Sequence, residues 1–157
     1  MQLFLGRHEN KVDAKGRVSV PAPFRAALAK EEYDGVVLFK APAAPAIEAI
    51  SMERMKLYVE SVDHLDMFTP KQNKLAAKIF ERSEMPKFDS HGRILLPGWM
   101  MEFSKITNRA LFVGRGNGFR IWEPSAYAEE EAKLQDDEDL EELSFRLIKP
   151  PPMGADS

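Results

Sequence analysis

The chain has 157 residues, of which 44% are hydrophobic, and this composition suits a soluble globular protein. It contains no cysteine, which excludes structural disulfides and thiolate metal sites and is compatible with a reducing cytoplasm. No run approaches the roughly 18 apolar residues that a membrane helix needs, and the first residues, MQLFL, lack the basic start of a secretory signal. We therefore expect a cytoplasmic protein with no membrane segment.

The formal net charge of −3 at pH 7 is distributed unevenly along the chain. Residues 1–128 carry 19 Lys and Arg against 15 Asp and Glu, whereas residues 129–142 carry one Lys against nine acids. The first 30 residues are basic, with six Lys and Arg against two acids. The acidic run is typical of a solvated helix face or a disordered tail, and it could also compete with anionic ligands for the basic surface.

In chain order, the first half is predicted to form short elements separated by turns. Asp13 and Gly16 occupy the first and fourth positions of a type I turn, where an Asx hydrogen bond and a permissive backbone are useful. Alternating Val18 and Val20 indicate a half-buried strand, and Pro21 ends it and opens a helix. The predicted elements are strands at 3–4, 17–20, 36–39 and 47–50 and a helix at 21–29, with a further helix after Ser51.

The second half repeats this order. The predicted elements are a turn at 89–92, strands at 94–96, 110–113 and 119–122, a tight turn at 114–118, and helices at 99–103 and after Pro124. Between the halves, Pro70 opens a predicted helix whose apolar residues are spaced by four. The other side of that helix carries Lys71, Lys74, Lys78 and Arg82, which we interpret as a solvated face.

The two halves also share a motif. Residues 12–21 read VDAKGRVSVP and residues 88–97 read FDSHGRILLP, so Asp, Gly, Arg and Pro recur at an offset of 76 with matching apolar flanks. A single Asp-x-x-Gly-Arg is usually an ordinary surface hairpin, but two copies with matching flanks indicate two copies of one module. Modules of roughly 50 residues are too small for a secure core alone, so we expect them to share one.

The paired Asp-x-x-Gly-Arg turns, each followed by a strand and a proline-led helix, resemble the MraZ family. The similarity covers roughly residues 1–135, includes the LFVG and IWE stretches of the second module, and matches the family pattern at 15–21 (KGRVSVP). One departure is His91, which stands where the first turn has Lys15; a histidine is a weaker cation than a lysine at neutral pH, so it binds phosphate less strongly.

The resemblance implies an α+β fold with a pseudo-two-fold swapped-hairpin β-barrel of double AbrB type and peripheral helices. It implies a first SpoVT-AbrB module at 3–53, connecting helices at 54–82, a second module at 83–127 and an acidic helical or disordered tail at 128–157. It also implies a nucleoid-associated transcriptional regulator that forms rings. Such a ring binds short repeated elements in the promoter of the gene cluster for division and cell-wall synthesis.

The residues have their own chemistry for DNA. The major groove admits a two-stranded ribbon, and Arg can donate two parallel hydrogen bonds to guanine O6 and N7. Arg17 and Arg93 are therefore the candidates for base reading, while Lys15 and His91 suit phosphate. Arg7 and Lys11, with Arg25, widen the basic face. We interpret four residues as structural parts of the turns: Asp13, Gly16, Asp89 and Gly92.

Two hypotheses stay open. The first is a sequence-specific regulator that binds double-stranded DNA as a homo-oligomer. The second is an oligomeric assembly protein whose basic turns bind an acidic protein partner. We expect no enzyme, cofactor, catalytic residue, metal or small-molecule substrate, because the three histidines are scattered and no phosphate loop or paired acid and base is evident. The glycine-rich stretch 114–118 lies between two apolar strands and is predicted to be a hairpin turn.

Overall fold

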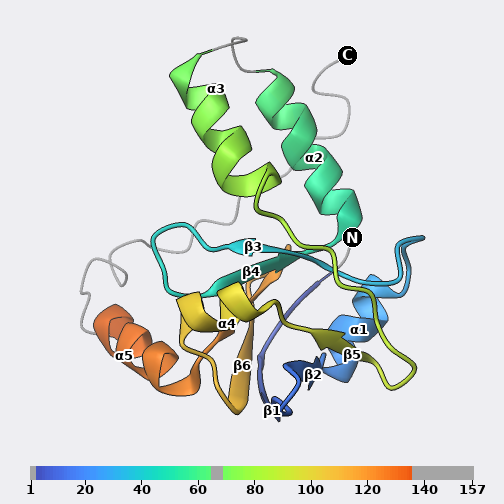
Figure 1. Ribbon diagram of the computed structural model, residues 1–157, viewed down its shortest axis with the longest axis vertical. Helices are drawn as coiled ribbons and strands as arrows, with labels where there is room; N and C mark the ends of the chain where they lie inside the picture. Colours follow the sequence, from blue (N-terminus) through green and yellow to red (C-terminus); the bar gives the residue numbers. More distant parts are fainter. Residues whose placement is uncertain (1–2, 65–68, 136–157) are drawn as a thin grey trace, which may run out of the picture. The chain divides into compact units, whose positions relative to one another are not determined.

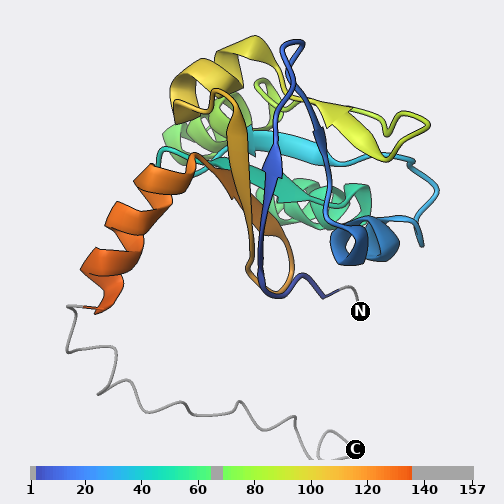
Figure 2. The ribbon, with the colours of Figure 1, turned by 90° about the horizontal axis from the view of Figure 1, so that it is seen from below.

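The computed structural model describes residues 3–64 and 69–135, and the chain divides into two units at residues 127 and 128. The first unit contains all the described strands, and it is drawn in Figures 1 and 2. Its main sheet has five antiparallel strands in the order β1 (Arg7–Lys11), β6 (Arg109–Gly114), β7 (Phe119–Trp122), β4 (Ile47–Ile50), β3 (Val37–Lys40). A second, two-stranded sheet pairs β2 (Arg17–Ser19) with β5 (Arg93–Leu95).

The two halves of the sequence interlock through these pairings. Strand β1 of the first half pairs with β6 of the second, and β4 pairs with its counterpart β7. In return, the segment that precedes the second turn meets β3 at the Leu38–Glu84 bridge. The main sheet is open, with β1 and β3 as its edges, so the described residues form a mixed α+β fold, as predicted, and not a closed sheet.

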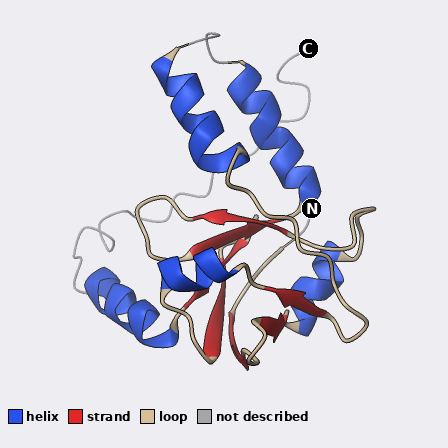
Figure 3. Cartoon of the chain, viewed as in Figure 1, coloured by secondary structure: helices blue, strands red, loops and turns tan. Residues whose placement is uncertain are grey.

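The helices of the first unit lie outside its strands (Figure 3). Prolines precede α1 (Ala22–Leu28) and α4 (Gly98–Ser104), as the motif predicts. The hydroxyl of Ser51 caps α2 (Met52–Asp63) by accepting from Arg54 N, and Thr69 caps α3 (Pro70–Leu75) in the same way. A π-helical turn, η1 (Ala76–Phe80), continues α3, and α5 (Pro124–Gln135) follows the last strand.

The core is shared between the two halves. Phe4 and Phe24 of the first half pack against Phe119 of the second, with ring centroids 5.2 and 4.8 Å from the Phe119 ring. Val18 and Ile94, which are partners in the β2–β5 ladder, are both 1% exposed in this cluster. Burial of aromatic and branched side chains from both halves supplies the stabilisation that neither could gain alone.

Two local differences from the predicted elements concern the start of the chain. The predicted strand at residues 3–4 is a single bridge between Phe4 and Gly116. Strand β1, in contrast, has the wholly polar sequence RHENK, which carries no apolar alternation. Its extended conformation comes from pairing with β6 along its whole length.

Candidate nucleic-acid interface

Turn 1 (residues 13–17) is organised by one carboxylate. The Gly16 amide donates to the Asp13 carbonyl (3.0 Å), which closes the turn. Asp13 Oδ1 accepts from the amides of Lys15 (3.0 Å) and Arg17 (2.8 Å), and Oδ2 accepts from Arg17 Nε (2.7 Å). The aspartate therefore fixes both the backbone and the guanidinium that follows it.

Turn 2 (residues 89–93) repeats this arrangement. The Gly92 amide donates to the Asp89 carbonyl (3.1 Å). Asp89 Oδ1 accepts from the amides of His91 (2.8 Å) and Arg93 (2.9 Å), and Oδ2 accepts from Arg93 Nε (2.8 Å). Gly16 and Gly92 have φ of +87° and +74°, which other residues rarely adopt, so glycine is needed at both positions.

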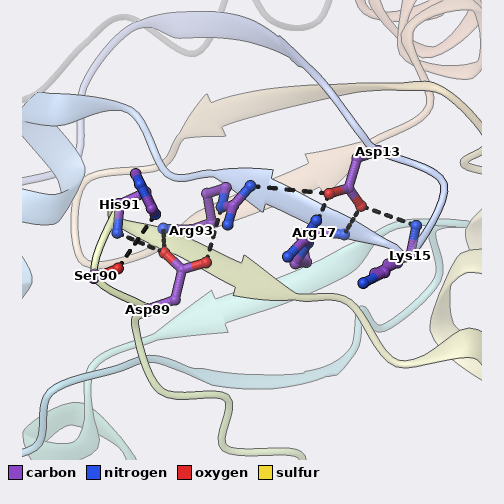
Figure 4. Close-up of polar contacts among 7 residues, drawn as sticks. All are labelled: Asp13, Lys15, Arg17, Asp89, Ser90, His91 and Arg93. Carbon is purple, nitrogen blue, oxygen red and sulfur yellow. Dashed lines mark hydrogen bonds and ion pairs between the residues drawn. The ribbon is translucent and has the colours of Figure 1, made fainter.

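The two turns are joined into one ribbon (Figure 4). Strand β2 pairs with β5, with Val18 opposite Ile94. Two symmetric hydrogen bonds extend the ladder, from Val20 N to Gly92 O (3.2 Å) and from Leu96 N to Gly16 O (2.9 Å). Figure 4 shows the six predicted side chains of the turns grouped along this ribbon, with Arg93 Nη1 4.0 Å from Asp13 Oδ2.

The electrostatics of the two carboxylates reflect these bonds. The hydrogen bond from the Arg93 amide is the main cause that lowers the pKa of Asp89 to about 2, helped by the His91 amide and the Arg93 side chain. The Arg17 amide lowers the pKa of Asp13 in the same way. Both aspartates are therefore charged at neutral pH and hold their arginines by charge-assisted hydrogen bonds.

The two arginines are partly exposed, with side-chain exposures of 36% for Arg17 and 28% for Arg93. Each aspartate accepts from the Nε of its arginine, which fixes the orientation of the planar guanidinium, and Arg93 Nη1 also forms an ion pair with Asp13 of turn 1. A guanidinium group that is oriented in this way can donate to two acceptors on one base or phosphate.

The structure places the remaining predicted residues at different distances from the ribbon. Lys15 and His91 are exposed at the tips of the two turns. Lys11 ends β1, next to Val12, whose bridge to Val18 joins β1 to β2. Arg7 lies at the other end of β1, roughly 14 Å along the strand, with its guanidinium 5.9 Å from the centre of the Tyr127 ring. A DNA contact of Arg7 stays a prediction.

Arg25 in α1 lies closer to the turns than the sequence analysis indicated. Its Nη1 donates to Val20 O (2.9 Å), and a Cβ built on Gly92 would lie 2.7 Å from that same Nη1. In turn 1 the corresponding neighbour of Gly16 is the Sδ of Met101, 3.3 Å from a built Cβ. Arg25 and Met101 are 76 residues apart, which is the offset of the repeat. This offset indicates in the sequence that the two side chains occupy equivalent places beside turn 2 and turn 1.

Two other features are not found among the described residues, a metal site and a membrane span. No three His, Asp or Glu side chains among them are placed to hold a metal ion. No helix in the described ranges is long and apolar enough to span a membrane.

The shared core and paired turns define the class of protein, an α+β chain whose two halves carry matching Asp-x-x-Gly-Arg turns. A family model described as "MraZ protein, putative antitoxin-like" matches residues 3–40 and 79–149. The chain belongs to the MraZ family, so the resemblance drawn from the motif is confirmed.

Similar proteins named "Transcriptional regulator MraZ" occur in several bacteria. The one from Pelagibacter ubique is 39% identical over 147 residues, which cover 94% of this chain and 95% of that protein. The one from Gluconacetobacter diazotrophicus is 39% identical over 129 residues, covering 80% and 82%. The one from Parvibaculum lavamentivorans is 38% identical over 130 residues, covering 82% and 80%.

Proposed function

We propose that this protein is a transcriptional regulator that binds double-stranded DNA through the ribbon formed by turns 1 and 2. The observation that carries the proposal is the pair of arginines held by matching aspartates on one β2–β5 ribbon. The names of the relatives support the regulatory role.

The geometry suits a major groove. The groove is about 12 Å wide and admits a two-stranded β-ribbon. Arg17 and Arg93 would each donate from their terminal amino groups to guanine O6 and N7. Lys15, His91 and Lys11 would contact phosphates, which fix the register of the protein without reading bases.

Membership of the family supports the finer parts of the proposal. The target is the promoter of the division and cell-wall gene cluster, with short repeated elements, and the protein acts in the cytoplasm at the nucleoid. It binds as a ring-shaped homo-oligomer, in which several weak ribbons give strong binding together. The interlocked pairing of β1 with β6, and the bridges from Glu84 to Leu38 and from Lys87 to Gly35, support a pseudo-two-fold swapped-hairpin barrel as the scaffold.

The test measures binding to the DNA upstream of the protein's own gene and to a random duplex of equal length, at several salt concentrations. The wild-type protein should prefer the upstream DNA, and its affinity should fall steeply with salt. The Arg17→Ala/Arg93→Ala variant should lose that preference. Unchanged binding by this variant overturns the proposal, and salt-sensitive binding without any preference would favour an acidic protein partner instead.

The matched control is Arg115→Ala. Arg115 is an exposed arginine at another hairpin tip, between β6 and β7. Because β6 separates it from the ribbon by roughly 20 Å of strand, its loss should leave the preference for the upstream DNA unchanged.

A further inference from the structure

A large groove lies away from the turns, between the loop 40–45, the α3–η1 helix and α4. Its volume is about 1160 Å³, which is ample for a segment of polypeptide. We call it the α3–α4 groove. Within the first unit, it brings together residues from the connecting helix and from both modules.

The walls of the α3–α4 groove combine apolar and basic side chains. Leu75, Ile79, Trp99 and Phe103 are all partly exposed and line it. Five exposed cations also line it, against one carboxylate from Glu102. These cations are Lys40, Lys71, Lys74, Lys78 and Arg82.

Two of these cations lie over aromatic rings of the groove. Lys40 Nζ lies 4.4 Å from the centre of the Phe103 ring, and the Arg82 guanidinium lies 4.7 Å from the centre of the Trp99 ring. The Trp99 ring is held in turn by a hydrogen bond from Nε1 to Glu84 (3.0 Å). Among the described residues, no carboxylate lies within 4.0 Å of Lys71, Lys74 or Lys78. A surface of this kind fits a segment that is both acidic and apolar.

The chain carries such a segment in its own sequence. Residues 136–147 read DDEDLEELSFRL, with six acids, one arginine and four large apolar residues. They lie outside the described residues. The chain continues for 22 residues beyond Gln135, which could extend for up to roughly 70 Å.

We propose that the α3–α4 groove of one copy binds residues 136–147 of a neighbouring copy. The acids would meet the lysines of the groove, and the leucines and phenylalanine would lie against Leu75, Ile79 and Phe103. Groove and segment are different surfaces, so each copy would bind the next head to tail, and such contacts close into rings when the rotation allows. The inference rests on the homo-oligomer in the proposed function and assigns the residues that form it.

The experiment measures the mass of the full-length protein by sedimentation velocity without DNA. The wild-type protein should be oligomeric. A groove variant, Lys74→Glu/Lys78→Glu, and a segment variant, Asp137→Lys/Asp139→Lys, should each fall towards the 17.8 kDa monomer. The control variant, Lys30→Glu/Lys56→Glu, reverses two exposed lysines that do not line the groove and should stay oligomeric.

Mixing the two variants is the decisive step. In the mixture, the charge-reversed groove of the first variant can bind the charge-reversed segment of the second. The unchanged groove of the second variant can bind the unchanged segment of the first, so oligomers should return. Oligomers that persist in each variant alone overturn the inference. Recovery when both changes lie in one chain, without recovery on mixing, would show that the groove binds its own segment, which also overturns it.

These outcomes are separable from those for DNA binding. Circular dichroism checks that each variant is folded. If the groove is not the contact but the wild-type protein is an oligomer, the proposed function stands. A monomeric wild-type protein would contradict this inference and the ring together, while the arginine-dependent choice of DNA would still be measurable.

Discussion

In both turns the aspartate holds the following arginine in the same way, but the additional positive charge near each turn comes from a different residue. Turn 1 carries Lys15 at its tip and has the uncharged Met101 beneath Gly16. Turn 2 carries His91 at its tip and has the Arg25 guanidinium beneath Gly92. The pseudo-symmetric fold thus places one additional cation near each turn, at the tip in one case and beneath the turn in the other.

Because of this difference, we expect the two turns to contact DNA in different ways. A lysine at an exposed tip can follow a phosphate freely, because its ammonium is a compact charge on a flexible stem. Arg25 is tied to the Val20 carbonyl, so its charge is fixed in position. We therefore expect turn 1 to adapt to the DNA backbone and turn 2 to hold a more rigid position.

The largest effect should come from removing one arginine at a time. Arg17→Ala and Arg93→Ala should each weaken binding by about 1–3 kcal/mol per contact, or roughly 5- to 150-fold. Each loss should also relax the preference at a different base pair, because the two arginines occupy different positions on the ribbon. Competition binding with single base-pair substitutions measures both effects. A uniform loss across all sequences would mean that the arginines contact phosphate rather than bases.

The next largest effect concerns the glycines. Gly16→Ala and Gly92→Ala should each destabilise the protein by roughly 1–2 kcal/mol, because both positions have positive φ. In Gly92→Ala, the new Cβ must also displace Arg25, whereas in Gly16→Ala it meets the Leu96 carbonyl at 3.3 Å. Urea denaturation gives the free energies of unfolding.

The double variant Gly92→Ala/Arg25→Met sharpens this comparison. Removing the guanidinium relieves its clash with the new Cβ, so the double variant should lose less stability than the two single changes added together. Strict additivity would contradict the contact between Arg25 and turn 2.

A smaller effect should follow from exchanging the tips. His91→Lys should strengthen DNA binding several-fold and steepen its dependence on salt, by roughly 0.9 in the logarithmic slope for one further phosphate contact. Lys15→His should have the opposite effect at turn 1. Both are measured by salt titration on one duplex. If neither variant changes the slope, the tips do not contact phosphates.

Much of this arrangement could be predicted from the sequence, where local patterns determine structure. Strands β4 and β7 occupy the residues that were predicted for them, 47–50 and 119–122. The turns were predictable because Asp and Gly at fixed positions have specific backbone roles. The relation between Arg17 and Arg93 followed from the repeat, although the sequence could not show that β2 and β5 pair directly.

What could not be predicted depends on contacts between distant residues. Strand β1 is polar throughout, and only its partner β6 makes it extended. Arg7 and Lys11 look equivalent in the sequence, but they lie at opposite ends of β1, and only Lys11 is near a turn. The apolar and basic sides of α3 gave no indication that α4 and the loop 40–45 would complete a groove with them.

The smallest predicted effect compares the aspartates through pH. Because folding lowers the pKa of Asp89 to about 2, its contribution to stability is fully present above about pH 4 and is lost as the pH falls through the folded value. Asp89→Asn keeps an oxygen for the two amides but removes the charge that holds Arg93. Between pH 4 and pH 2, the free energy of unfolding of the Asp89→Asn variant should therefore fall less than that of the wild-type protein. Urea midpoints across this range measure the difference, and Asp13→Asn should behave in the same direction. An acid response that neither substitution reduces would mean that folding does not lower the pKa of these two carboxyl groups, and this would contradict the charge-assisted bonds that hold the arginines.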